Sequence, residues 1–225
     1  MPSVTANGIS QHYELSGEGR TTIVWIHGIG SRLETWATTT PQVPGFRHLV
    51  YDVRGMGESG HEPGPVSLST WARDLDALME ALAIPSAVIA GHSMGGAITQ
   101  RFAIDFPHRT KGLILFATSS RVGGALAAGW LKRAEEFAVA GNQAMAATNR
   151  AVAAYRMDEG LKRITVPTLI LVGSDDPQTP PGGSVIMSRC IPHSELEIYP
   201  GIGHSIYRDE PKSVERAKRW LTQFA

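Results

Sequence analysis

The chain has 225 residues, of which 42% are hydrophobic and 19% charged, and this is enough for one hydrophobic core. Lysine plus arginine and aspartate plus glutamate each total 21, so the formal net charge is zero and neither a nucleic acid nor an anionic membrane is indicated as a partner. The sequence shows no signal-peptide pattern and no apolar run of membrane-spanning length, so we expect a single cytoplasmic domain over residues 1–225.

The first elements predicted along the chain are β-strands. Residues 4–15 alternate around Asn7-Gly8, a pair that is typical of a tight hairpin turn. Short apolar runs then follow, and several are apolar on both faces, as buried parallel strands are. These runs are 22–26, 48–51, 87–90, 112–116, 168–172 and 196–199.

Amphipathic helices are predicted between and after these strands. Apolar residues recur at steps of three and four from Leu68 to Leu82 and from Val214 to Phe224, and residues 97–106 also have a helical pattern. This alternation indicates an α/β fold, with a mainly parallel sheet of about eight strands, an antiparallel hairpin at its start and helices on both faces. Ligands of such sheets bind at the carboxyl ends of the strands.

The most specific local pattern is Gly91-His92-Ser93-Met94-Gly95-Gly96, which links a predicted strand to a predicted helix. A serine on so tight a turn has a strained backbone, and the residues two before and two after it pass too close for a Cβ atom, so glycine fits at both places. The helix that follows directs its free N–H groups toward a developing oxyanion. The pattern makes Ser93 a candidate nucleophile, with an ordinary glycine-rich turn as the alternative.

Other polar residues follow neighbouring predicted strands. His27-Gly28 follows the run 22–26, Asp175-Asp176 follows the run 168–172, and His204 follows the run 196–199. These strand ends are expected to meet Ser93 at one edge of the sheet. A serine hydroxyl is a poor nucleophile at neutral pH and needs a histidine base that a carboxylate orients. The chain supplies serine, acid and histidine in that order, with two candidate acids.

Together these motifs resemble the α/β-hydrolase superfamily over nearly the whole chain. The resemblance rests on His27-Gly28, on the pattern Asp-x-Arg-Gly-x-Gly-x-Ser at 52–59, on the serine turn, and on Asp176 and Gly203-His204. Residues 164–181 further resemble the branch that contains 3-oxoadipate enol-lactonases and small carboxylesterases.

The resemblance implies a role for each candidate. Ser93 is the nucleophile, His204 the general acid and base, and Asp176 the carboxylate that orients the imidazole, since the acid of this family lies three residues after the glycine that ends the strand. The backbone N–H groups of Ile29 and Met94 are implied as the oxyanion hole.

Three further residues near these motifs are expected to be structural. His27 would hold the oxyanion loop through hydrogen bonds, and Asp52 and Arg54 would form an ion pair that pins adjacent turns. Cys190 has no partner for a disulfide or a metal, and the histidines lack metal-ligand spacing, so we expect no metal and no cofactor.

The predicted function is hydrolysis of carboxylic esters, short-chain esters or lactones, through an acyl-enzyme on Ser93, with this small molecule as the partner. Enol-lactonase activity is one alternative, and it would call for an arginine near the site to bind the substrate carboxylate. A ligand receptor on a hydrolase scaffold with little turnover is another. The last alternative is a dinucleotide-binding site at Gly28-x-Gly30. The pattern of such sites, Gly-x-Gly-x-x-Gly, requires a third glycine at position 33, where this chain has Leu33.

Residues 121–163 form the position at which relatives in this family insert a helical cap over the nucleophile. Two short helices are predicted there, from Leu126 to Gly141 and from Met145 to Tyr155, the second with Asn142 as its N-cap. Because this cap is abbreviated, we expect a wide site with broad activity on short-chain esters. Trp130 is the predicted pocket residue, and apolar side chains exposed here lead to the hypothesis of a homodimer through the cap.

Overall fold

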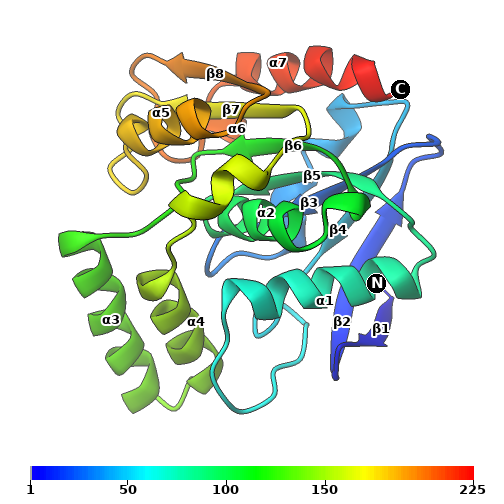
Figure 1. Ribbon diagram of the computed structural model, residues 1–225. Helices are drawn as coiled ribbons and strands as arrows, with labels where there is room; N and C mark the ends of the chain where they lie inside the picture. Colours follow the sequence, from blue (N-terminus) through cyan, green and yellow to red (C-terminus); the bar gives the residue numbers. More distant parts are fainter. Residues whose placement is uncertain (1) are drawn as a thin grey trace.

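The computed structural model describes residues 2–225, and its centre is one eight-stranded sheet (Figure 1). The strand order is β1-β2-β4-β3-β5-β6-β7-β8. β2 is antiparallel to β1 and to β4, whereas every pairing from β4 to β8 is parallel. The strands are β1 (Ser3–Ala6), β2 (Ile9–Ser16), β3 (Thr22–Ile26), β4 (Arg47–Tyr51), β5 (Ala87–His92), β6 (Thr110–Phe116), β7 (Thr168–Gly173) and β8 (Ser194–Tyr199). The expected mainly parallel sheet with an initial hairpin is confirmed.

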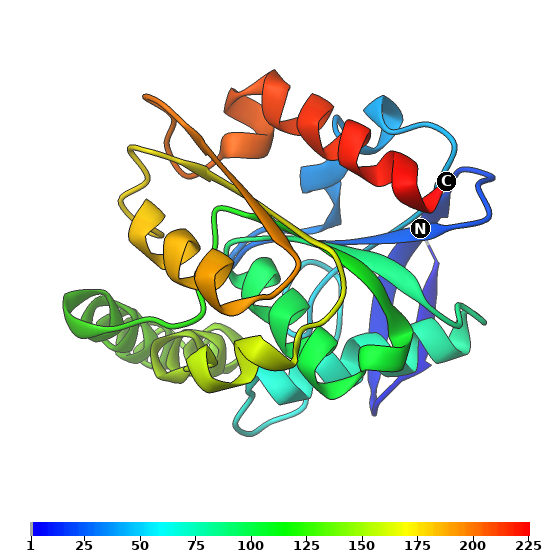
Figure 2. The ribbon, with the colours of Figure 1, turned by 45° about the horizontal axis from the view of Figure 1, so that its top comes forward.

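Helices cover both faces of this sheet (Figures 1 and 2). They are α1 (Leu68–Ala81), α2 (Met94–Asp105), α3 (Gly124–Val139), α4 (Gln143–Ala154), α5 (Pro181–Cys190), α6 (Ile206–Asp209) and α7 (Pro211–Leu221). One hydrophobic cluster joins the sheet to α1, α2 and α5, and a second joins it to α6 and α7. The layers are therefore helix, sheet, helix, as an α/β fold requires.

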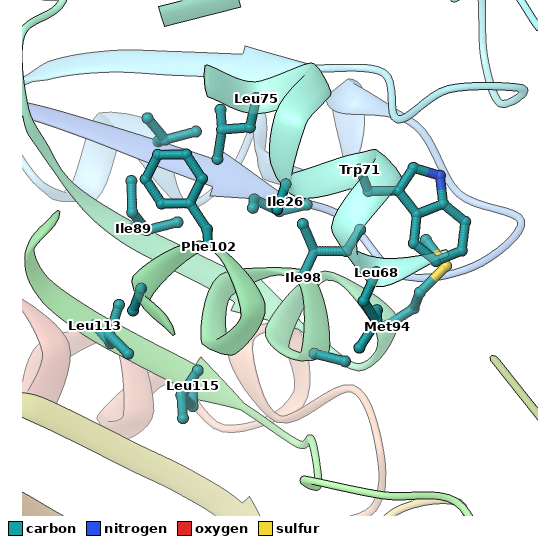
Figure 3. Packing of buried hydrophobic residues seen from close by; sticks show 14 of the residues in the cluster. Ile26, Leu68, Trp71, Leu75, Ile89, Met94, Ile98, Phe102, Leu113 and Leu115 are labelled. Carbon is teal, nitrogen blue, oxygen red and sulfur yellow. The ribbon is translucent and has the colours of Figure 1, made fainter. Parts of the chain in front are cut away.

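The side chains of each central strand alternate between these two clusters. In β3, Val24 and Ile26 pack with α1 and α2, whereas Ile23 and Trp25 pack with α7. Figure 3 shows Ile26 in the first of these clusters, near side chains of α1 and α2. Both faces are buried because successive side chains of a strand point to opposite sides, so a continuous apolar run fills two cores.

Two local turn predictions are confirmed. Asn7 and Gly8 have φ angles of 46° and 77°, the pair of positive values that a two-residue type I′ hairpin turn needs. At the start of α4, the Asn142 side-chain oxygen accepts a hydrogen bond of 3.0 Å from the N–H of Met145.

Helices α3 and α4 are inserted between β6 and β7 and lie side by side at one end of the molecule (Figures 1 and 2). Of α3, only Ala134 is buried, while Leu131 is 50% and Val139 90% exposed. The insertion begins after the carboxyl end of β6, so it leaves the sheet at the edge where the carboxyl ends of the parallel strands meet.

Two features differ from the sequence-based expectations. Helices α5 and α6 were not expected, since their segments carry no clear apolar period. The predicted Asp52–Arg54 ion pair is wrong: Arg54 pairs with Asp74 of α1 at 2.6 Å, and Asp52 pairs with His12 of β2 at 2.7 Å. Both pairs are buried, and each joins elements that are far apart in the chain.

Candidate active site

Ser93 lies in the turn between β5 and α2 with a backbone φ of 55° and ψ of −120°. This left-handed conformation is strained for a residue with a side chain, and it directs Ser93 out of the line of both elements. A Cβ atom on Gly91 would lie 2.3 Å from the Gly95 carbonyl oxygen, and one on Gly95 would lie 2.2 Å from that of Ile26. The two glycines therefore permit the close packing that holds the turn.

Hydrogen bonds from β6 and the residues after it fix the backbone of this turn. The N–H of Ser93 donates to the carbonyl oxygen of Phe116 at 3.0 Å, and the Thr118 hydroxyl donates to the carbonyl oxygen of Ser93 at 2.7 Å. The strained conformation of Ser93 is thus held by hydrogen bonds at both its backbone N–H and its backbone C=O.

His204 and Asp176 meet at the ends of β8 and β7. The Nδ1 of His204 lies 2.7 Å from Oδ2 of Asp176, whose side chain is fully buried. The neighbouring Asp175 is exposed, and its carboxylate accepts a hydrogen bond from the Ser174 hydroxyl instead. Of the two candidate acids, Asp176 is the one in contact with the imidazole. The contact is made at Nδ1 of His204, so Nε2 is the ring nitrogen that does not bind Asp176.

Three hydrogen bonds besides that of His204 hold the Asp176 carboxylate. Oδ1 accepts from the N–H groups of Gln178 and Thr179 at 2.8 and 3.0 Å, and Oδ2 accepts from the Thr179 hydroxyl at 2.6 Å. Burial acts to raise the pKa of Asp176, but the hydrogen bonds from His204 and Thr179 outweigh it and lower the pKa to about 2. Asp176 is therefore ionised at neutral pH.

Thr179 was not singled out from the sequence, although it contributes two of these hydrogen bonds. Its hydroxyl also lies 3.4 Å from His204 Nδ1. A cavity of about 230 Å³ adjoins Thr179 and reaches Leu126 at the start of α3. The signal that could have found Thr179 is the turn chemistry of an aspartate whose carboxylate accepts from the backbone two and three residues later.

The proposed oxyanion loop after β3 is oriented by His27. Nδ1 of His27 lies 2.8 Å from the Gly28 carbonyl oxygen, and Nε2 lies 3.0 Å from the N–H of Val53. Since a carbonyl only accepts and an N–H only donates, His27 carries its proton on Nδ1 and accepts at Nε2. Burial lowers the pKa of His27, which keeps it in this neutral form.

The hydrogen bond to Gly28 also sets the direction of the next N–H. Gly28 C=O and Ile29 N–H belong to one planar peptide and point in opposite directions. With the carbonyl held by His27, the Ile29 N–H points away from the ring, and Gly28 itself packs close to Ser93 Cβ. In the described part of the chain, no backbone carbonyl accepts from Ile29 or Met94, so both N–H groups are free to bind an anion.

Trp130 lies on α3 and is half-buried against the first hydrophobic cluster, the one that joins the sheet to α1, α2 and α5. The guanidinium of Arg133 lies over its ring at 4.9 Å from the centroid.

Among residues 2–225, no cluster of three or more histidine, cysteine, aspartate or glutamate side chains could hold a metal ion. None of the helices over the same residues combines the length and apolar character needed to cross a membrane.

Comparison with known proteins gives consistent matches over the chain. The family profile described as alpha/beta hydrolase fold matches residues 21–156, and one described as TAP-like protein matches residues 138–223. The 3-oxoadipate enol-lactonase 2 of Acinetobacter baylyi is 25% identical over 256 residues, which cover 96% of this chain and 94% of the relative.

Two solved structures have nearly the same backbone arrangement. A hydrolase from Pseudomonas aeruginosa has a TM-score of 0.88 and 26% identity, and the match covers 98% of this chain and 97% of the other. A thermophilic esterase from Thermogutta terrifontis has a TM-score of 0.90 and 24% identity, with 99% of both chains covered.

Proposed function

Because this chain belongs to the alpha/beta hydrolase fold family, we propose that it hydrolyses carboxylic esters through an acyl-enzyme on Ser93. The observation that carries the proposal is the combination of a serine at φ 55° with the His204–Asp176 hydrogen bond of 2.7 Å, at the carboxyl ends of parallel strands. A serine on a strained turn and an oriented imidazole are the two parts that nucleophilic ester hydrolysis needs.

In the proposed mechanism, Oγ of Ser93 attacks the acyl carbon while Nε2 of His204 takes its proton. The C=O electron pair moves to the carbonyl oxygen, and the N–H groups of Ile29 and Met94 bind this oxyanion. When the carbonyl reforms, the C–O bond to the alcohol breaks and His204 returns the proton to the leaving alkoxide. A water molecule, deprotonated by His204, then attacks the acyl carbon; the bond from this carbon to Oγ of Ser93 breaks, the acid is released, and His204 returns the proton to Ser93.

Asp176 has two tasks in this mechanism. By accepting at Nδ1 it keeps the Nε2 lone pair of His204 available to Ser93, and its negative charge stabilises the imidazolium that forms. Its low pKa supports this role, because the carboxylate stays charged throughout the cycle.

Short-chain esters are the proposed substrates. The α3–α4 insertion is short and α3 buries only Ala134, so it offers few contacts remote from the reacting bond that could select larger substrates. Three arginines are candidates to bind a substrate carboxylate: Arg32 pairs with Glu34 at 3.5 Å and Arg121 with Asp158 at 3.0 Å, whereas Arg133 lies over the ring of Trp130. The lactonase relative supports lactones as a second substrate class for the same chemistry.

The test is a panel of p-nitrophenyl esters of increasing chain length together with neutral and acidic lactones, run on the wild type and on Ser93→Ala. We expect repeated turnover of acetate and butyrate esters by the wild type and none by the variant. A single slow acylation without turnover would instead support a ligand receptor. Turnover retained by Ser93→Ala would rule out the proposed nucleophile.

A further inference from the structure

We propose that His92 is a positioning residue that fixes the loop of His204 to the nucleophile turn and so sets the distance between the base and Ser93. This inference rests on the proposed function of Ser93 and His204. His92 is the last residue of β5 and the chain neighbour of Ser93, yet its side chain points into a contact with the loop after β8.

The contact is a hydrogen bond with a defined direction. Nε2 of His92 lies 2.9 Å from the carbonyl oxygen of His204. A carbonyl oxygen can only accept, so the proton of His92 is on Nε2 and this N–H donates. The two imidazole rings are also adjacent, with their centroids 4.7 Å apart, and Tyr207 packs edge-on against His92 at 4.8 Å.

His92 remains a neutral donor during the proposed reaction. Burial, followed by repulsion from a charged His204, lowers the pKa of His92 to about 3. The ring therefore does not compete with His204 for the Ser93 proton, and it adds no positive charge beside the imidazolium.

The opposite side of the His92 ring faces the proposed oxyanion loop. A Cβ atom on Gly28 would lie 3.1 Å from Nδ1 of His92, closer than nearly all real Cβ contacts. The ring thus fits between Gly28 and the loop of His204. One side chain in this way contacts two of the segments that surround Ser93.

Further hydrogen bonds of the loop of His204 lead to the segment after β7 that carries Asp176, and they include the His204–Asp176 bond itself and a bond from the N–H of Gly201 to the Ser174 hydroxyl at 2.9 Å. The N–H of Asp175 donates to the Ile202 carbonyl oxygen at 3.0 Å, and a Cβ atom on Gly173 would lie 2.0 Å from the same oxygen. Loss of the His92 hydrogen bond would leave the Asp176–His204 pair intact, but the distance between that pair and Ser93 would no longer be fixed by this bond. A misplacement of about 1 Å in such a site can lower the rate about 10²-fold.

The experiment compares His92→Phe, which keeps a ring but has no donor, with His92→Gln, whose amide N–H₂ can reach the position of Nε2. His48→Phe is the matched control. His48 is also buried and donates from Nε2 to a carbonyl oxygen, that of Val43 at 3.0 Å, but it lies away from the serine turn in the core beside Trp25.

We expect His92→Phe to lower kcat for p-nitrophenyl butyrate by about 10- to 100-fold with little change in KM, and His92→Gln to recover much of that loss. His48→Phe should lower the thermal midpoint by a similar amount while kcat stays within about twofold. The proposal is wrong if His92→Phe loses no more kcat than the His48→Phe control, or if His92→Gln is no better than His92→Phe.

A second measurement needs no turnover and separates this inference from the proposed function. Nitrogen-15 NMR of labelled histidines should show His92 as the Nε2–H tautomer from about pH 5 to about pH 8. In His92→Phe, the ring signals of His204 should broaden or shift. Unchanged His204 signals would overturn the positioning role, whereas an inactive wild type with the expected NMR result would count only against the proposed function.

Discussion

The substitution Asp176→Asn tests the assignment of the acid most directly. In the structure, Oδ1 of Asp176 accepts from two backbone N–H groups, so an asparagine would keep its oxygen there and place its NH₂ group in the position of Oδ2. That NH₂ group would face Nδ1 of His204, now 2.7 Å from Oδ2. Since an amide NH₂ only donates, Nδ1 would have to become an acceptor and the proton of neutral His204 would move to Nε2.

A His204 with its proton on Nε2 cannot take the proton of Ser93, and loss of the correct tautomer lowers kcat by about 10⁴-fold in a trypsin-like protease that uses the same three residue types. The geometry of the loop should survive, because the other hydrogen bonds can be retained by asparagine or by rotation of the Thr179 hydroxyl. We expect this loss in kcat for p-nitrophenyl butyrate, with KM changed little. The matched control is Asp175→Asn, whose exposed carboxylate accepts only from Ser174 and which should stay within about twofold of the wild type. Equal activity losses in the two variants, or a larger loss in the control, would refute the reasoning.

Three further outcomes are expected. Gly95→Ala should lower the free energy of unfolding by more than about 3 kcal/mol in urea titrations, because its Cβ would lie 2.2 Å from the Ile26 carbonyl oxygen. The control Gly129→Ala, in open space on α3, should raise the free energy of unfolding by about 0.5–1 kcal/mol. A loss of less than about 1 kcal/mol in Gly95→Ala would contradict the close approach. Asp176 ionises more readily in the folded protein than in the unfolded chain, so its contribution to stability is complete above about pH 4 and is lost as the pH falls to about 2. The difference in the free energy of unfolding between wild type and Asp176→Asn should therefore shrink by up to about 2 kcal/mol over that range. A difference that stays constant with pH would exclude the low pKa. If copies associate through the exposed face of α3, light scattering at high concentration should give twice the 24.2 kDa chain mass, and Leu131→Glu should restore the monomer. A wild-type protein that stays monomeric would reject this association.

Most of the fold could be predicted because its signals are local. The apolar runs of the central strands, the Asn7-Gly8 turn and the Asn142 cap each depend on residues within a few positions of one another. Helix α5 could not be predicted in this way. It begins with Pro181 and two glycines and buries only Ser184 and Met187, so its stability comes from packing against the sheet rather than from its own sequence.

The pairing of charged residues was the least predictable feature. Asp52 and Arg54 are two positions apart, but the turn after β4 directs them to different partners, His12 on β2 and Asp74 on α1. Closeness in sequence does not imply contact outside a regular element, since irregular φ and ψ angles decide the direction of each side chain.

The order of serine, acid and histidine at successive strand ends and the need for glycine around Ser93 could both be read from the sequence, because they follow from backbone geometry that a short segment specifies. The choice of Asp176 over Asp175 followed from the family resemblance and is seen in the structure as a contact with His204, whereas the support of the carboxylate by Thr179 and the bond of His92 to the loop of His204 could be found in the folded chain alone. These contacts join loops that are far apart in the chain, and their existence depends on how parallel packing brings the strand ends together.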